Sequence, residues 1–389
     1  MLDTQALPHY FNAEHADYRA ALRDFVAREI TPHVNEWDED ESFPRELYAK
    51  IAHLGVLGIG YPEALGGTSA DIFYHLITAE EMARSGSGGV SASLLSHTIG
   101  LPPVNAYGSE ALKQKVVPAV LRGEKIAGLA VTEPGGGSDV ASLKTTAVRD
   151  GDHYVVTGEK VFITSGMRAD YLTVAVRTDP NNKGAGGVSA LLIECDTPGL
   201  TRTPLKKMGW WASDTAHLRF DQVRVPVAHL LGAENQGFKV FMNNFNAERL
   251  GMSAQACMFA QVCLHEATDW ARERRTFGET LSSRQVIRHK LVDMAMRIEA
   301  ARSLVYELAW QVQHQVGDPA HLVARTCMAK ILSTQAMQFC ADQAVQILGG
   351  MGFMRGTRSE RIYREVKVMM IGGGSEEIMK DLAARQLGI

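Results

Sequence analysis

The chain has few cysteines and no long apolar run. Five of its 389 residues are cysteines, and no two of them have Cys-x-x-Cys spacing. An odd number without that spacing is not typical of a disulfide framework or a zinc site, so we expect reduced thiols in the core. The apolar stretches are shorter than the ~18 residues that a membrane-spanning helix needs. The composition therefore argues against a disulfide-stapled protein and predicts no membrane span.

An excess of charge of one sign is also missing. Lys and Arg number 40 against 44 Asp and Glu, which gives a formal net charge of −4, and the basic residues form no run. Proteins that bind nucleic acid or anionic membranes usually cluster their Lys and Arg. We therefore expect neither as a partner. The 13 histidines lack the spacing of a metal site, and no metal is assigned.

Targeting signals are not recognisable at either end of the sequence. Met1–Asn12 has neither the basic flank nor the apolar centre of a secretory signal, and Leu387–Ile389 does not match a peroxisomal address. We expect a bacterial cytoplasmic protein, with the mitochondrial matrix as the second option.

The sequence pattern changes twice along the chain. Residues 1–123 contain helical segments, residues 124–235 alternate apolar and polar positions as strands do, and residues 236–389 return to long helical periodicity. These ranges are the three expected domains. The order does not suit a doubly wound fold, which needs alternating β and α units, so the predicted fold class is α+β.

Local signals predict individual elements. Asn12 and Asp71 are capping residues ahead of helical patterns, and Glu110–Leu121 predicts a further helix. Asp150-Gly151 predicts a hairpin between two strands. Apolar residues at alternating spacings of four and three predict the buried stripe of a bundle helix: Ile287, Leu291, Met294, Ile298, Ala301, Val305 and Leu308.

A glycine-rich loop opens the middle part of the chain. The run Thr132–Asp139 reads Thr-Glu-Pro-Gly-Gly-Gly-Ser-Asp. Consecutive glycines let a backbone approach another group closely. Taken alone, the run is more typical of a tight turn that leads into the β module.

Together with the strand Gly158–Gly166, this run resembles the signature of the acyl-CoA dehydrogenase family. The order of helices, sheet and helices matches that family over essentially the whole chain. The resemblance implies an N-terminal α-helical domain, a middle β-barrel and a C-terminal four-helix bundle. It also implies FAD as the cofactor and an acyl-CoA thioester as the substrate.

The resemblance assigns the flavin ring to these two segments. Thr132 and nearby amides are expected at the pyrimidine side, Thr164 near the reactive ring nitrogen, and Phe162 over the ring face. Neutral donors fixed there would stabilise the negative charge that hydride transfer builds on the ring. Ser138 is also expected to touch the phosphopantetheine end of the substrate. The expected cofactor contacts in this part are Leu129, Val131, Thr132, Gly137, Ser138, Phe162 and Thr164.

A second group is expected to hold the adenosine diphosphate half of FAD. Read locally, Arg274 is a surface charge and Gly349-Gly350 end a helix. In the family, residues at these positions come from a neighbouring subunit, with the arginine on the pyrophosphate. The implied residues are Arg274, Phe277, Gln285, Gln346, Gly349, Gly350 and, after the glycine turn, Ser375 and Glu377. Sharing of the cofactor between chains implies, by analogy, a homotetramer.

The catalytic base is expected at Glu248. Many members of the family carry their glutamate where this chain has Gly373, which has no side chain to take a proton, whereas the isovaleryl and long-chain branches place it at the position of Glu248. Phe245, Glu248 and Met252 recur at helical intervals and so share one face. A solvated helix glutamate is the alternative interpretation. The expected substrate contacts are Ser138, Phe245, Asn246, Arg249, Gly373 and Gly374, with the Gly373 N–H donating to the thioester carbonyl.

The resemblance therefore predicts FAD-dependent dehydrogenation of an acyl-CoA to a trans-2-enoyl-CoA, with electrons passed to an electron-transfer flavoprotein. Gly373 and neighbouring Gly372 leave room that would suit branched or bulky acyl groups, and medium or long chains stay open. One alternative is a relative that uses oxygen, an acyl-CoA oxidase or flavin monooxygenase. The other is a non-catalytic or nucleic-acid-binding member of the fold, which would be expected to have a basic extension and no base.

Overall fold

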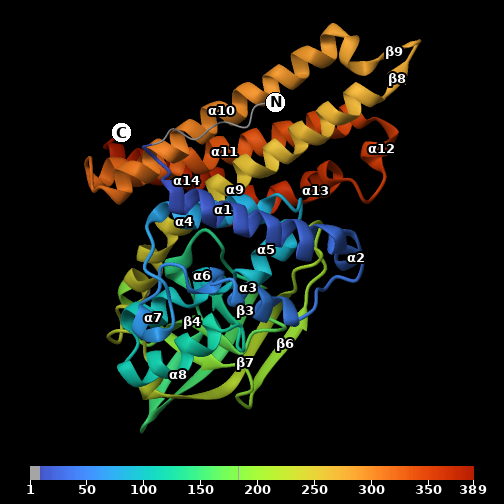
Figure 1. The fold of residues 1–389 in the computed structure, drawn as a ribbon. Helices are drawn as coiled ribbons and strands as arrows, with labels where there is room; N and C mark the ends of the chain where they lie inside the picture. The colour runs from blue at the N-terminus through green and yellow to red at the C-terminus, as the bar shows by residue number, and fades with distance from the viewer. Residues whose placement is uncertain (1–8, 183) are drawn as a thin grey trace.

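The computed structural model describes residues 9–182 and 184–389, apart from the side chains of residues 243 and 244. Residues 1–8 of the Met1–Asn12 segment therefore lie outside the described residues. Long C-terminal helices form one layer of the molecule, and the sheet lies at the opposite side (Figure 1). Helices from the N-terminal third lie between the C-terminal helices and the sheet. The α+β arrangement predicted from the sequence is confirmed.

The N-terminal third is helical and begins at the predicted caps. The Asn12 side chain accepts from the His15 N–H at the start of α1 (Ala13–Phe25), and Asp71 does the same for Phe73 at α4 (Ile72–Ala83). The helix predicted at Glu110–Leu121 is α8. The other α-helices described there are α2 (Val34–Glu39), α3 (Glu46–His53), α5 (Gly88–Leu94), α6 (His97–Gly100) and α7 (Pro102–Tyr107).

A buried carboxylate joins α1 to α4. Glu81 on α4 is fully buried and forms ion pairs with Arg19 and Arg23 of α1 and with Arg84. Burial alone would raise the pKa of Glu81, but the Arg23 hydrogen bonds and the charges of Arg84 and Arg19 outweigh it and hold the pKa below its usual value. The carboxylate therefore stays ionised and fastens the two helices together.

The middle third forms a curled seven-stranded sheet where the sequence predicted a β-barrel. The strands follow the order β1-β4-β2-β3-β7-β6, and β5 pairs with β4. The predicted Asp150-Gly151 hairpin joins β2 to β3, whose residues pair from Thr146 with Thr157 to Asp150 with His153. The strands are β1 (Ala127–Ala130), β2 (Thr146–Asp150), β3 (His153–Thr164), β4 (Tyr171–Arg177), β5 (Val188–Glu194), β6 (Leu200–Pro204) and β7 (Thr215–Pro226).

The C-terminal third is built on three long helices, α9 (Gly237–Glu273), α10 (Gln285–Gln313) and α11 (Pro319–Leu348). The predicted stripe of α10 is buried from Met294 to Leu308, and its first two members are partly buried against the same core. The short hairpin of β8 (Arg275–Thr276) and β9 (Glu279–Thr280) joins α9 to α10. Three more helices follow: α12 (Gly350–Phe353), α13 (Arg358–Ile371) and α14 (Glu376–Leu387).

A glycine seats the first turn of α9 on the sheet. A Cβ on Gly237 would lie 2.3 Å from the carbonyl carbon of Ser189 in β5, a separation that no side chain tolerates. From there α9 runs into the helical layer, where it packs on α4, α10 and α11. This single helix therefore links the sheet to the helical layer. No helix among the described residues is long and apolar enough to cross a bilayer.

Candidate active site

The glycine-rich loop and strand β3 are joined at the predicted flavin segment. The Val161 N–H donates to the Thr132 carbonyl at 2.9 Å, which brings the loop beside β3. At the same point the pairing of β3 with β7 shifts register, between Lys160 and Ile163. A bulge of this kind turns a side chain out of the regular alternation. Phe162 is the residue turned out here.

Phe162 has the exposure and strain expected of a ligand-facing residue. Its φ is +62°, in the left-handed region that bulky residues rarely adopt, and 69% of its surface is exposed. A strained aromatic residue standing open beside a glycine loop fits a flat apolar partner such as a flavin ring. Leu129, Thr132 and Thr164 are partly buried and Val131 is buried, while Gly137 and Ser138 lie exposed on the loop.

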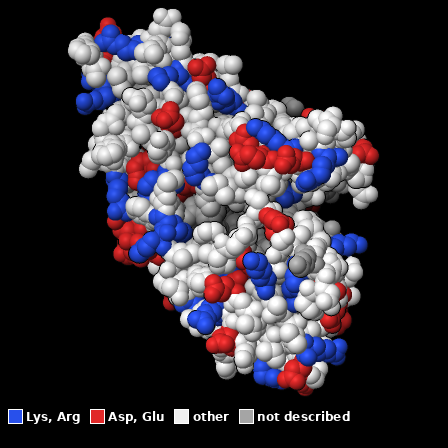
Figure 2. Space-filling view, turned by 180° about the vertical axis from the view of Figure 1, so that it is seen from behind, with Lys and Arg blue, Asp and Glu red and all other residues white. Residues whose placement is uncertain are grey.

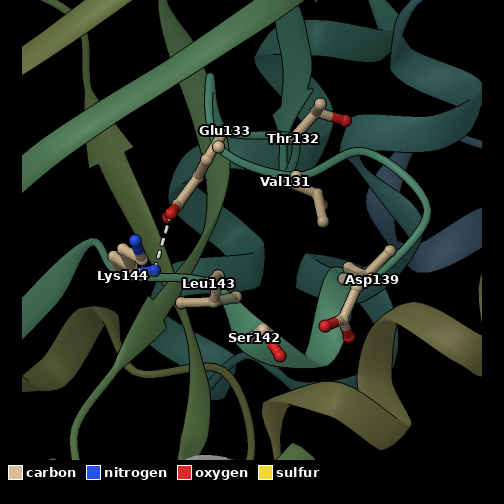
Figure 3. Close-up of a pocket in the computed structure, with 10 residues that line it drawn as sticks. Val131, Thr132, Glu133, Asp139, Ser142, Leu143 and Lys144 are labelled. Carbon is tan, nitrogen blue, oxygen red and sulfur yellow. Dashed lines mark hydrogen bonds between the residues drawn. The ribbon is translucent and has the colours of Figure 1, made fainter.

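A buried ion pair anchors the start of the loop. Glu133 accepts from the Lys160 ammonium at 2.8 Å and from the backbone N–H groups of Lys144 and Thr145. Burial alone would raise the pKa of Glu133, but the Lys160 charge and these hydrogen bonds lower it. Figure 3 shows Glu133 turned toward Lys144, on the rim of a hollow that Asp139 also lines. The loop is therefore held at its base and open along its glycines.

Glu248 lies in the N-terminal half of α9, directly before Arg249. The residue is half-buried, its Oε2 atom is buried, and that atom has no hydrogen-bond partner among the described residues. Burial raises the pKa of Glu248 to about 7, against the charges of Arg249 and Lys330, which lower it. A carboxyl group with a pKa near neutrality and a free oxygen has the properties of a general base.

The turn that contains Gly373 lies against the same part of α9. Arg249 donates through Nε to the Gly373 carbonyl at 2.9 Å and through Nη1 to Asn246 at 3.1 Å. Gly373 has φ +67°, and a Cβ there would lie 3.1 Å from the Met252 Sδ atom. The structure thus brings the predicted substrate residues Asn246, Arg249, Gly373 and Gly374 together with Glu248. The Phe245 ring lies 5.7 Å from the Arg249 guanidinium.

The sequence interpretation missed Lys330 of α11. Its ammonium donates to the carbonyls of Met370 and Gly374, both at 2.8 Å, on either side of the glycine turn. A lysine inside an otherwise small and apolar helical stretch, Cys327–Leu332, was the signal available in the sequence. Ser375 follows as the N-cap of α14, where it accepts from the Ile378 N–H, and Glu377 is exposed in the first turn.

The remaining predicted cofactor residues lie apart from the glycine loop. In Figure 1 the β8–β9 hairpin and α12 are at one end of the helical layer, away from the sheet. Phe277 is 97% exposed at the hairpin tip. Arg274, Gln285, Gln346, Gly349 and Gly350 are exposed as well. Within one chain the structure does not bring this group next to Thr132 and Phe162.

Figure 2 shows the molecule from behind, with a hollow in the surface between the helical layer and the part that contains the sheet. Acidic and basic side chains are interspersed around this hollow. Among the described residues no group of three His, Cys, Asp or Glu could hold a metal ion.

Comparison with known proteins agrees with this arrangement. Family models for the N-terminal, middle and C-terminal domains of acyl-CoA dehydrogenase match residues 12–124, 128–223 and 235–388. The chain belongs to the acyl-CoA dehydrogenase family. It is 37% identical to the probable acyl-CoA dehydrogenase YngJ of Bacillus subtilis, over 95% of this chain and 96% of the relative.

Solved structures are similar over nearly the whole chain. A putative acyl-CoA dehydrogenase from Mycobacterium smegmatis has 46% identity and a TM-score of 0.94, covering 98% of this chain and 99% of the other. A glutaryl-CoA dehydrogenase from the same organism, solved in complex with FADH2, has 26% identity and a TM-score of 0.91, covering 99% and 96%. Acyl-CoA dehydrogenases are oxidoreductases that use FAD, so the enzyme class and the cofactor predicted from the sequence are confirmed.

Proposed function

We propose that the protein removes the α-proton and the β-hydride of an acyl-CoA thioester and that Glu248 is the base. The observation that carries the proposal is the buried, unpartnered Glu248 Oε2 beside the Gly373 turn. Because its pKa is near 7, the carboxylate is available at neutral pH and is basic enough to accept a proton in the transition state.

The residues of the chain would share the reaction as follows. FAD, when bound, supplies the hydride acceptor. Glu248 takes the α-proton, the Cα–H and Cβ–H bonds break, and a trans Cα=Cβ bond forms. The Gly373 N–H donates to the thioester carbonyl and stabilises its developing negative charge. Phe162 would pack on the flavin ring, Thr132 and Thr164 would donate hydrogen bonds to it, and Leu129, Val131, Gly137 and Ser138 would help to hold it.

The shared cofactor site is part of the same proposal. Arg274, Phe277, Gln285, Gln346, Gly349 and Gly350 would reach the FAD of a neighbouring subunit, with Ser375 and Glu377 close to the glycine turn. Their exposure supports this, as does the position of the β8–β9 hairpin and α12 at the end of the helical layer away from the sheet (Figure 1). A homotetramer, an electron-transfer flavoprotein as acceptor and a cytoplasmic location follow by analogy with the family.

The substrate preference is proposed for branched acyl groups. Gly373 has no side chain, and the Met252 thioether lies where a side chain at this position would project; this thioether is flexible and adapts to irregular shapes. A branched α,β-carbon unit would therefore displace a methionine side chain and would not meet a fixed carboxylate. Medium and long straight acyl chains are the alternative substrates, and the test below compares them with branched ones.

The test is anaerobic reduction of the bound flavin by a panel of branched and straight acyl-CoA esters. We expect rapid loss of the flavin's visible absorption with the wild type, fastest with branched esters. E248Q should be slower by about 10²–10⁴-fold with unchanged flavin content. In the wild type the rate should rise as pH passes through about 7, because Glu248 must lose its proton.

E273Q, an exposed glutamate at the end of the same helix, is the matched control and should behave as wild type. Undiminished reduction in E248Q would move the base elsewhere in the chain. Equal rates for straight and branched esters of similar length would reject the branched preference alone. Peroxide formed in stoichiometric yield with air would favour the oxidase alternative over transfer to a flavoprotein.

A further inference from the structure

Lys330 is a buried lysine whose ammonium donates hydrogen bonds to uncharged groups. The residue is 1% exposed on α11, which packs against α9, α13 and α14. Lysines are almost never fully buried unless their ammonium is paired. The partners here are two neutral backbone carbonyls, those of Met370 and Gly374, each at 2.8 Å.

One of these bonds has an ordinary structural explanation. Met370 is the residue before the end of α13, and the last carbonyls of a helix lack intrahelical partners and favour a cation. The bond to Gly374 is different, because it lies beyond the helix and outside its dipole. Lys330 therefore holds both ends of the segment 371–373, whose Gly373 and the following Gly374 have φ +67° and +112°.

A third bond holds the middle of the same turn. Arg249 of α9 donates to the Gly373 carbonyl at 2.9 Å. All three bonds engage carbonyl oxygens, and the structure records no acceptor for the Gly373 N–H among the described residues. Glycine backbones are conformationally free, so a donor placed on one must be fixed by its surroundings. Catalytic groups need placement to within about 0.5 Å.

We propose that Lys330 is a positioning residue for the dehydrogenation: by holding the Met370 and Gly374 carbonyls, it fixes the turn that presents the Gly373 N–H to the thioester carbonyl beside Glu248. The inference rests on the proposed function and adds to it a residue that touches neither substrate nor cofactor. It acts through the glycine turn.

Lys330 also belongs to the electrostatic environment of the base. The charged and titratable groups that face it are Arg249 and Glu248 of α9, Cys327 of its own helix and Glu376 of α14. Burial and the charge of Arg249 lower the pKa of Lys330 to about 8, while Glu248 opposes the shift. Near neutral pH the ammonium is protonated, and its charge lowers the pKa of Glu248.

The experiment compares FAD-loaded wild type, K330M and K330R with the ester that reduces the wild type fastest. The rate of flavin reduction at saturating ester and the ester concentration for half-saturation are measured across pH. We expect K330M to lose about 10- to 100-fold in the saturated rate, because the amide donor is misplaced, with a smaller change in half-saturation. The acid limb of its pH–rate profile, where the rate rises as Glu248 loses its proton, should move to higher pH because Glu248 loses a neighbouring cation. K330R should restore that limb.

M337A is the control for a purely structural effect. Met337 is fully buried on the same helix, so its truncation lowers stability without touching the turn. The proposal would be overturned if K330M had the same saturated rate of flavin reduction and the same acid limb as the wild type. An equal shift of the limb in M337A would do the same. If no ester reduced the flavin of the wild type, the proposed function itself would be rejected. Failure of the Lys330 proposal and failure of the proposed function are therefore distinguishable.

A second measurement needs no turnover. Glu248 has a folded-state pKa raised above its unfolded value, so it costs stability as pH rises through about 7, and E248Q removes that cost. The gain in melting temperature from E248Q above pH 7 should be larger in K330M than with Lys330 present. An equal gain contradicts the electrostatic part. If K330M does not fold, K330Q, which keeps one donor, carries both tests. Failure of both to form folded holoenzyme would count against the proposal, because Lys330 would then serve the whole fold.

Discussion

At the scale of single residues, Gly373 has two separate reasons to be glycine. Its φ of +67° lies in the region that L side chains rarely adopt, and a Cβ would lie 3.1 Å from the Met252 Sδ atom. The first reason is local backbone strain and the second is packing against α9. The chain offers a control that separates them, because Gly151 has φ +62° and nothing within 4 Å of an added Cβ.

We expect G151A to cost about 1–2 kcal/mol in the free energy of unfolding, from backbone strain alone. G373A should cost about the same plus up to ~1 kcal/mol for displacing the flexible Met252 side chain. In an M252A background, the added cost of G373A should fall to that of G151A. Denaturant unfolding of the five proteins measures these differences. An excess cost that survives in M252A would place the packing conflict elsewhere.

Sequence reasoning singled out Glu248 as a candidate and passed over Lys330 for a physical reason. Glu248 lies on a face with Phe245 and Met252, and helical spacing makes such a face visible in the sequence. The acceptors of Lys330 are 40 and 44 residues away, and they are carbonyl oxygens that every residue carries. No residue type marks such a partner, so only the packing of α11 against α13 and α14 reveals it.

At the scale of elements, strong local signals predicted the fold best. Asn12 and Asp71 cap the helices predicted after them, and Asp150-Gly151 turns between β2 and β3. Helix α13 was not predicted, although it has a buried face, because much of that face is charged: Glu360, Arg361 and Glu365 are buried with its apolar residues. Charged residues that pair inside the protein look like a solvated surface in the sequence.

The Glu81 carboxylate joins two helices, α1 and α4, through its ion pairs. E81Q should lower the free energy of unfolding by about 2–4 kcal/mol near neutral pH, because Arg19, Arg23 and Arg84 lose their shared anion. Urea unfolding measures this effect. E110Q, on a side chain that is 80% exposed, should cost less than about 0.5 kcal/mol.

The pH dependence of this effect has a definite sign. The folded-state pKa of Glu81 is lowered, so its contribution is full above the unfolded value of about 4.3 and is lost as pH falls through the folded-state pKa. The difference between wild type and E81Q should therefore shrink in acid. A difference that is constant between neutral and acidic pH would mean that the Glu81 charge is not what joins the helices.

At the scale of the whole molecule, two parts of the predicted cofactor site lie far apart in one chain. The glycine loop and Phe162 lie at the sheet, while Phe277 and Arg274 lie at the free end of the helical layer (Figure 1). The family resemblance assigned the second group to a neighbouring subunit, but the order of residues along the chain gave no position for either group in space. Their separation is what the fold adds, and it makes the proposed oligomer a requirement of the proposed chemistry.

This separation has a genetic consequence: two inactive subunits should complement each other. If Arg274 serves the neighbour's site, a mixed pair of E248Q and R274A subunits contains one intact site and one doubly defective site. Random mixing of equal amounts should then restore activity at about a quarter of the sites, although each variant alone is inactive. Turnover after co-expression measures it, and R272A, a nearby exposed arginine, should be active alone. Mixtures that stay inactive would assign Arg274 to its own chain's site.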